Sequence, residues 1–580
     1  MGILEQFNAV VGTITAFLFQ DAFLFTLLGT GVIFTIWSGF CQYRAVTHGT
    51  AVLRGLYDDP KDPGAINHFQ ALSAALSATV GLGNIGGVAL AIALGGPGAV
   101  FWMWMVGILG MSIKLTEVTL SMLYRNTDDP ENPHGGPMWV VSRAVEEIKP
   151  EWSGFGKLVG WIFCVTCVAY TITGGVMFQA WNVGDITEVY FHIPSWISGL
   201  ILAVFVGMVI IGGIKRIGAV ASRLVPFMVV LYLLGGSYVL LVNIESIPEI
   251  IKLIFVSAFN PQEASGAFIG GTVGYAIMIG MRRALFSSEA GAGSSPIAHS
   301  AAKTDEPVRE GVVGGLEPFI DTIVVCTFTA MIILSSGLWE RSGEAEFEVT
   351  PVIVEAGSGI WTIDSLSAPS RIDQEQWRVG ENVFVILRGD DNPDTGNDLH
   401  RLGAEIVRLD DGSVGISFSQ IEMSQKPQLN DEYIYASYPG ATLTAKAFDN
   451  ALPGLGKWLV TLASWFFAIS TMISWSYYGE QGIVFMFSQR AVSTYRYLLC
   501  LTIVIATMGI IKTPQELDNF SGLGIGLMLW ANVPITLIFG YKAMAAYKDY
   551  VARLKAGEIQ RNPNPPSFFS EVLTGKDVEK

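Results

Sequence analysis

Residues 65–113 contain no Asp, Glu, Lys or Arg, yet glycines cluster in the middle of this stretch, between Gly81 and Gly87. An uncharged apolar run of this length predicts a helix that crosses a membrane. Because glycine weakens a helix, the cluster predicts a break in that helix. Backbone groups freed by the break cannot face lipid, so they must be buried in protein or line a cavity. The stretch therefore predicts a substrate or ion site at mid-membrane depth.

The spacing Gly81-x-Gly83-x-x-Gly86 also fits the dinucleotide-binding fingerprint. That fingerprint requires a preceding strand and an acidic residue about 20 positions later, and this stretch has neither. The chain also lacks HExxH, GxSxG and Walker A motifs, and its six histidines are scattered. We therefore expect that the protein is not an enzyme.

Composition extends the membrane interpretation to the whole chain, since 51% of the residues are hydrophobic and only 15% are charged. Soluble domains carry about 25% charged residues. Eleven apolar segments are predicted to span the bilayer, which indicates an all-α polytopic membrane protein. Their approximate limits are 22–42, 68–94, 98–122, 157–183, 195–213, 220–243, 266–282, 311–337, 455–477, 495–511 and 520–541.

Basic residues in the short loops predict the orientation, because they favour the cytoplasmic side. With the N-terminus outside, most of them collect on one face, and the opposite loops hold little more than Lys252 and Lys512. The residues on the first face are Arg44, Arg54, Lys61, Arg125, Arg143, Lys149, Lys215, Arg216, Arg223, Arg282, Arg283, Lys303, Arg309, Arg490, Arg496, Lys542, Lys548, Arg553 and Lys555. We expect a multi-pass protein of the plasma membrane, in a bacterium the inner membrane, with the N-terminus outside and the C-terminus cytoplasmic.

Residues 343–437 differ in character, because strand-forming runs such as Val383-Phe-Val-Ile-Leu387 alternate with turn sequences. Between Glu340 and Asn450 the chain carries 20 acidic and 8 basic residues, a balance of −12 out of −16. The acidic charge therefore belongs to a soluble insert and does not indicate nucleic acid. We expect a small extracytoplasmic β-domain with an unidentified partner. The predicted division is 1–342 with spans 1 to 8, 343–437 as the β-domain, 438–545 with spans 9 to 11, and 546–580 as a cytoplasmic tail.

After the first span, the other ten divide into two sets of five, and glycines interrupt the leading helix of each set. The first interruption is Gly81–Gly87 and the second is Gly266–Gly274, with glycine at 266, 270, 271 and 274. Paired interruptions at corresponding positions indicate the centre of an inverted-repeat transporter. Close helix packing by small residues explains either run alone, but it explains the matched pair less well.

The residues near the first break indicate the coupling cation. The first core helix has no ionisable group but offers Ser77, Thr79, Asn84 and free carbonyls, and helix 455–477 offers Ser470 and Thr471. Oxygen ligands without a full charge suit Na⁺.

Charged residues inside the predicted spans keep an alternative open. Glu317 and Asp321 share one face of helix 311–337, and proton coupling normally uses such a group. We favour an inner-vestibule or structural role for Asp321 and expect Lys114 and Glu117, three residues apart, to form an ion pair.

Several long motifs resemble the alanine or glycine:cation symporter family, also called the sodium:alanine symporters. The resemblance covers nearly the whole chain outside the insert. The motifs are Gly95–Gly110, Gly135–Met138, Gly280–Ser294, Phe319–Thr327 and Ser470–Glu480.

The resemblance implies a leucine-transporter-type fold with a 5+5 inverted repeat and one additional N-terminal helix. It also implies the site residues. The carbonyls of Ser77 and Val80, with Ser470 and Thr471, would hold Na⁺. The substrate would meet the unwound segment from Thr79 to Asn84, including the amides of Gly81 and Gly83, and also Gln179, Trp475 and Thr272. The chain departs from the family pattern at Leu82, Trp181, Ser288 and Ala292.

The function predicted from these features is secondary active symport of a small neutral amino acid, alanine or glycine, with Na⁺ by alternating access. One alternative is a proton-coupled amino-acid transporter that uses Asp321. Another is a receptor whose β-domain senses an amino acid while the helices only signal.

Overall fold

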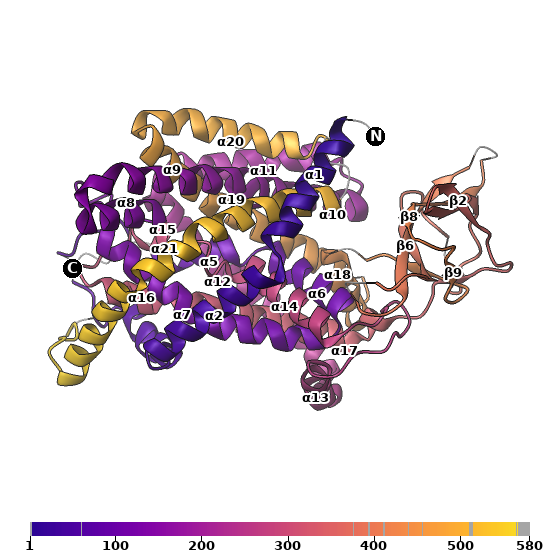
Figure 1. Cartoon of the computed structure of the whole chain (residues 1–580), viewed down its shortest axis with the longest axis horizontal. Helices are drawn as coiled ribbons and strands as arrows, with labels where there is room; N and C mark the ends of the chain where they lie inside the picture. Colours follow the sequence, from indigo (N-terminus) through magenta and orange to yellow (C-terminus); the bar gives the residue numbers. More distant parts are fainter. Residues whose placement is uncertain are drawn as a thin grey trace.

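The computed structural model describes residues 3–59, 61–374, 376–392, 395–409, 412–438, 440–454, 456–509, 514–563 and 565. A long helical part makes up most of the protein, and a smaller β-domain lies at one end of it (Figure 1). The helices are α1 (Ile3–Leu18), α2 (Asp21–Trp37), α3 (Cys41–Arg44), α4 (Thr50–Leu53), α5 (His68–Thr79), α6 (Val88–Gly95), α7 (Gly98–Tyr124), α8 (Pro137–Ile148), α9 (Ser153–Tyr170), α10 (Phe178–Phe191), α11 (Ser195–Ile210), α12 (Gly213–Val242), α13 (Ile247–Ser257), α14 (Val273–Ser288), α15 (Ser295–His299), α16 (Pro307–Gly314), α17 (Thr327–Ser336), α18 (Ala441–Ala451), α19 (Gly456–Met486), α20 (Val492–Ala506) and α21 (Pro514–Ala556). Between these ranges, π-helical segments adjoin some of the helices, at Ala45–Gly49, Gly83–Gly87, Thr171–Met177 and Phe319–Cys326.

Each predicted span contains helical structure, but fewer than eleven helices qualify as spans by length and hydropathy in the described residues. In the described residues, seven stretches qualify, and the bent pair His68–Thr79 and Gly83–Gly95 makes an eighth. The three other predicted spans contain α11, α14 and α20, which have 16, 16 and 15 residues. These helices are shorter than the roughly 20 residues needed to cross hydrocarbon.

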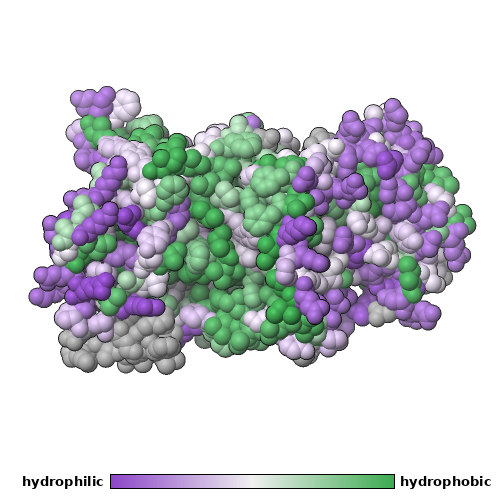
Figure 2. Space-filling model, turned by 90° about the horizontal axis from the view of Figure 1, so that it is seen from below, coloured by the Kyte–Doolittle hydropathy of each residue, from purple (hydrophilic) through white to green (hydrophobic). Residues whose placement is uncertain are grey.

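The two ends of the chain also extend beyond the predicted spans. Helix α1 precedes the first predicted span, and α21 continues to Ala556, well past the predicted limit at residue 541. The end of α21 lies opposite the β-domain, whereas α1 begins on the side of the β-domain (Figure 1). Figure 2 shows apolar side chains gathered over the middle of the helical part, between two more hydrophilic ends. This band is the surface expected of a protein surrounded by lipid.

The β-domain is built from short strands that all lie between residues 345 and 436. One sheet has the order β1-β10-β5-β6-β7-β4 with β9 paired to β5, and the second has the order β2-β3-β8. The strands are β1 (Ala345–Glu346), β2 (Ile353–Gly357), β3 (Ile360–Ile363), β4 (Leu366–Ser367), β5 (Asn382–Arg388), β6 (Leu399–Arg408), β7 (Val414–Phe418), β8 (Ile421–Glu422), β9 (Gln428–Leu429) and β10 (Tyr433–Ala436).

Strand β5 explains how the β-domain attaches to the helices, because both of its faces are buried. Side chains alternate along a strand, so Val383, Val385 and Leu387 point into the core of the β-domain. Phe384 and Ile386 point the other way and form a second cluster with Ala267 and Ile269, which precede α14. The unbroken apolar run in β5 therefore reflects docking onto the helical part.

Arg401 on β6 joins the β-domain to α6 and to the chain before α14. Its guanidinium donates to the carbonyl of Ala93, in the last turn of α6, at 3.0 Å and to the carbonyl of Ala267 at 2.7 Å. The chain that leaves the β-domain reaches the first break as well, since Thr444 on α18 donates to the carbonyl of Ile85 at 3.0 Å. The β-domain and α18 therefore contact both the first broken helix and the chain before α14.

We expect Arg401→Met to loosen this attachment, because two carbonyls would lose a charged donor worth about 1.5–3 kcal/mol per bond. Hydrogen exchange across residues 264–272 should become faster than in the wild type. Arg408→Met is the matched control on the same strand, because Arg408 donates to Gly412 within an exposed hairpin. Equal exchange in both variants would contradict the role of Arg401.

Candidate functional site

The structure confirms the predicted break in the first core helix. Helix α5 ends at Thr79, and Val80 follows in an extended conformation with φ −75° and ψ 93°. Helical backbone resumes at Gly83, and the two parts are bent by 53°. The amide of Gly81 donates to the side-chain Oδ1 of Asn84 at 2.7 Å. The break therefore exposes backbone groups in the protein interior, and Asn84 satisfies one of them.

The second break is not where the sequence predicted it. Gly266, Gly270 and Gly271 lie in the non-helical chain before α14, which begins only at Val273. The interruption comes between α14 and α15, at residues 289–294, where Gly291 and Gly293 have φ of +94° and +75°. The signal in the sequence was the glycine pair within the family motif Gly280–Ser294. The larger glycine run at 266–274 indicated the break instead. In the structure, that run belongs to the segment that contacts the β-domain.

Three of the four residues predicted to hold Na⁺ lie on α5 and α19, which pack side by side, and the fourth, Val80, directly follows α5. Ser77 on α5 donates through Oγ to the carbonyl of Ser470 on α19 at 2.6 Å, and Ser470 Oγ lies 3.5 Å from the carbonyl of Ser77. Val80 is fully buried and directly precedes Gly81. Thr471 Oγ1 is buried and has no hydrogen-bond partner among the described residues. These hydroxyls and carbonyls are the uncharged oxygen donors that fit Na⁺.

Gly81 is the point at which the predicted cation and substrate residues meet. A Cβ built on Gly81 would lie 2.8 Å from Thr471 Oγ1 and 3.8 Å from Gln179 Oε1. Gln179 Nε2 donates to the carbonyl of Gly174 at 3.3 Å. In the described part of the chain, Gln179 Oε1 is buried without a partner. Two acceptor oxygens thus face the break with their hydrogen-bonding capacity unused.

Trp475 lies four residues after Thr471 on α19 and packs among aromatic rings. It is 1% exposed, and its ring meets Tyr170 edge-on at 4.5 Å and Tyr478 at 5.0 Å between centroids. A Cβ built on Gly175 would lie 2.6 Å from the Cβ of Trp475. The indole is therefore held tightly between neighbouring helices.

Two predicted substrate residues are placed differently from the others. The hydroxyl of Thr79 bonds back to its own helix, at 3.4 Å from the carbonyl of Leu76. Thr272 caps α14 through Tyr275, and its amide donates to Thr395 of the β-domain at 2.7 Å. Ser287, at the other end of α14, contacts Asn84. Thr272 lies 15 residues before Ser287, which corresponds to about 22 Å along a helix. The structure therefore does not bring Thr272 to the group around Gly81.

Asp321 contacts the group around Gly81 through Asn84, whereas the sequence favoured an inner-vestibule or structural role and left a proton role open. Asn84 Nδ2 donates to Asp321 Oδ1 at 2.5 Å, and Ser287 and Thr322 donate to Asp321 Oδ2 at 2.6 and 2.9 Å. Asp321 is fully buried. The carboxylate thus orients the amide of Asn84, whose oxygen holds the backbone of Gly81. Ser287 was missed because only the packing of α14 against the π-helical segment Phe319–Cys326 places it here.

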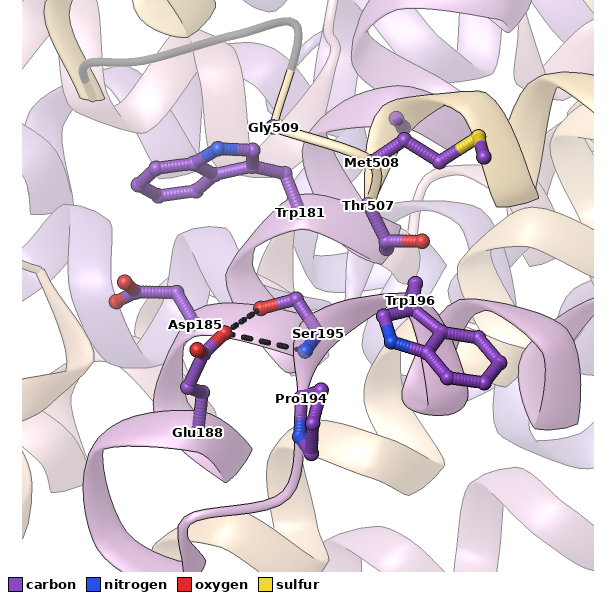
Figure 3. Close-up of a pocket in the computed structure, with 10 residues that line it drawn as sticks. Trp181, Asp185, Glu188, Pro194, Ser195, Trp196, Thr507, Met508 and Gly509 are labelled. Atoms are coloured by element: carbon purple, nitrogen blue, oxygen red, sulfur yellow. Dashed lines mark hydrogen bonds between the residues drawn. The ribbon is translucent and has the colours of Figure 1, made fainter.

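A separate cavity of about 400 Å³ lies between the ends of α10, α11 and α20. Figure 3 shows Trp181, Asp185 and Glu188 on one side and Trp196 and Met508 on the other. Glu188 accepts hydrogen bonds from the amide and hydroxyl of Ser195, at 3.1 and 2.5 Å. None of the predicted site residues lines this cavity, so it is distinct from the group around Gly81.

Comparison with known proteins identifies relatives of this chain. The chain is 34% identical to the sodium/alanine symporter AgcS of Methanococcus maripaludis, over 86% of this chain and 87% of AgcS. It is 27% identical to the amino-acid carrier protein AlsT of Bacillus subtilis, over 95% of this chain and 94% of AlsT. The solved structure of MhsT in complex with L-phenylalanine covers 86% of this chain and 99% of MhsT, with 12% identity and a TM-score of 0.44.

The profile of the sodium:alanine symporter family matches residues 4–368 and 427–564. The residues between the two matched parts, 369–426, lie within the β-domain. The match includes both breaks, α19 and the helices that carry Gln179 and Asp321. The chain therefore belongs to the sodium:alanine symporter family.

Proposed function

We propose that this chain is a secondary active symporter that moves a small neutral amino acid, alanine or glycine, together with Na⁺ by alternating access. The observation that carries the proposal is the pair of buried oxygens without partners among the described residues, Thr471 Oγ1 and Gln179 Oε1, that face Gly81. A buried polar atom without a partner is costly. A bound cation and a bound ammonium group would each supply the missing interaction.

The proposed roles follow from the chemistry of each group. Ser77, Val80, Ser470 and Thr471 would surround Na⁺ with uncharged oxygens. Gln179 Oε1 would accept a hydrogen bond from the substrate ammonium. The substrate carboxylate would lie at the start of the helical turn at Gly83, where free amides and the helix dipole favour an anion. Trp475 would limit the side chain to hydrogen or methyl.

Uptake into proteoliposomes tests this proposal. With an inward Na⁺ gradient and equal pH on both sides, labelled alanine should accumulate, and replacing Na⁺ with K⁺ should abolish accumulation. Competition by L- and D-amino acids would then define the substrate. Uptake driven by a proton gradient without Na⁺, and lost in Asp321→Asn, would instead favour the proton-coupled alternative.

The receptor alternative is tested by removing residues 343–437. We expect the shortened chain to retain Na⁺-driven uptake, because neither the predicted cation residues nor Gln179 lies in the β-domain. Stability should fall, since Ala267 and Ile269 lose their apolar partners on β5. Tight binding of alanine by the isolated β-domain, with no uptake by the full chain, would contradict symport.

We also propose that the β-domain and the N-terminus lie outside the cell and that the C-terminus is cytoplasmic. The support is the asymmetric distribution of basic residues in the short loops. Labelling of single engineered cysteines in the β-domain and near Ala556, using a reagent that does not cross membranes, tests the orientation in whole cells.

A further inference from the structure

Five ionisable side chains form a buried network outside the residues assigned to Na⁺ and substrate. His68, Lys114, His299, Glu310 and Glu317 are each at most 2% exposed. They come from α5, α7, α15, α16 and the helical residues just before the π-helical segment Phe319–Cys326. Ionisable groups inside a membrane protein are costly and are usually functional. The network therefore needs an explanation beyond packing.

His299 lies between two carboxylates. Its Nδ1 bonds to Glu310 Oε1, and its Nε2 lies 2.8 Å from Glu317 Oε1. An ionised carboxylate can only accept hydrogen bonds, and a neutral imidazole carries hydrogen on only one nitrogen. Both contacts can therefore be hydrogen bonds only when the group holds one additional proton, on the imidazole or on a carboxyl.

The charge balance of the network requires the same proton. Glu310 and Glu317 carry two negative charges against one positive charge on Lys114, whose Nζ lies 3.4 Å from Glu317 Oε2. His68 does not change this count, because its Nδ1 bonds to Glu310 while its Nε2 lies 3.6 Å from Asp58 Oδ1, so a positive charge on His68 is matched by Asp58. One more proton makes the network neutral, and neutrality is strongly favoured away from water.

Other charged groups around the network do not reverse this balance. Glu117 and Glu289 act electrostatically on Lys114 and add only negative charge. Asp58 lies 3.6 Å from His68 Nε2. Arg309 pairs with Asp62 at 3.3 Å. Arg125 donates to backbone carbonyls, including those of Ser300 and Ala302. Its positive charge also acts on Glu310, but the charges of Arg125 and Arg309 are together matched by Asp62 and Asp305.

The position of Glu310 links the network to the interrupted helices. One oxygen bonds to His68, the first residue of α5, and the other bonds to His299, the last residue of α15. Helices α5 and α15 lie on the sides of the two breaks that face away from the β-domain. A single carboxylate therefore holds both half-helices, and the proton on His299 is needed for one of the two contacts.

We propose that His299, with Glu310 and Glu317, forms a proton-binding site that is separate from the Na⁺ site and ties the two half-helices together. Release of the proton leaves one nitrogen of His299 facing a carboxylate without a hydrogen between them, so the half-helices separate more easily. The consequence for transport rests on the proposed function, whereas the consequence for stability does not.

The transport test uses proteoliposomes with a fixed Na⁺ gradient and equal pH on both sides. The pH is varied from about 6 to 9, a range in which histidine can change its charge. The wild-type uptake rate should change by about threefold or more across this range. His299→Gln, which cannot hold the proton, should give a flat profile. His48→Gln is the matched control and should keep the wild-type profile, because His48 is also buried but bonds to Tyr550.

Glu317→Gln gives a second, independent test that needs no transport. This variant removes one negative charge, so the network is neutral without the additional proton. In detergent, the Tm of the wild type should fall as pH rises and the proton leaves, and the Tm of Glu317→Gln should depend much less on pH. A wild-type pH profile in His299→Gln, or the same dependence of Tm on pH in Glu317→Gln and the wild type, would overturn the proposal. Absence of Na⁺-driven uptake at every pH would contradict symport but leave the measurement of Tm decisive for the proton site.

Discussion

Gly81→Ala is expected to lower Na⁺-driven uptake by about 10- to 100-fold, the range that corresponds to an overpacking cost of roughly 1–3 kcal/mol. The added methyl would lie 2.8 Å from Thr471 Oγ1 and would enter the space that Gln179 Oε1 faces. The side chain of Thr471 would have to turn away from the break. One substitution would therefore disturb both the predicted cation ligand and the predicted substrate contact, and initial rates at saturating Na⁺ would measure the loss.

Gly83→Ala is the comparison for this substitution, because it changes the next glycine of the same break. A Cβ built on Gly83 meets nothing within 4 Å, and the backbone amide is retained. We expect a much smaller loss of uptake than in Gly81→Ala. Equal losses would show that helix propensity governs the break, and would contradict the assignment of the space beside Gly81 to cation and substrate.

Ser470→Ala combined with Thr471→Ala is expected to raise the Na⁺ concentration needed for half-maximal uptake by about tenfold or more, since each lost ligand to a charged group costs about 1.5–3 kcal/mol. Thr471 Oγ1 has no other partner among the described residues. Ser470 Oγ lies against the carbonyls of Ser77 and Phe467. The Na⁺ dependence of alanine uptake at fixed ionic strength measures the effect.

Ser476→Ala on the same helix serves as the control, because its hydroxyl is buried but donates within α19 to the carbonyl of Ile473 at 2.6 Å. The half-saturating Na⁺ concentration of this variant should match the wild type. An unchanged Na⁺ dependence in the double variant would remove Ser470 and Thr471 from the cation site. The position of the break would then need another explanation.

Much of the site was predictable because its signals are local in the chain. Glycines at 81 and 83 in an uncharged helix predicted a break, and the hydroxyls at Ser470 and Thr471 predicted an oxygen-lined partner surface. The family motifs added Gln179 and Trp475. Thr272 was placed wrongly because the glycine run that suggested it forms a docking segment for the β-domain.

The charged residues show where local reasoning fails. Spacing along α7 predicted that Lys114 pairs with Glu117, but Lys114 contacts Glu317 and Glu117 accepts from Asn532 on α21. A buried charge must pair with an opposite charge in good geometry, because otherwise the cost of removing it from water is not offset. That partner comes from whichever helix packs alongside, and spacing within one helix does not reveal it.

The sequence by itself determined that the chain spans a membrane, that one core helix breaks at Gly81, that a β-domain is inserted and that the chain resembles the sodium:alanine symporters. The first three properties follow from hydropathy, glycine placement and turn chemistry, which act over a few neighbouring residues, whereas the resemblance rests on long sequence motifs. Only the tertiary structure decided that the second break lies at 289–294, that Asp321 orients Asn84, and that Glu310 binds both His68 and His299. Each of these depends on contacts between segments far apart in the chain, whose geometry is set by how the helices pack together.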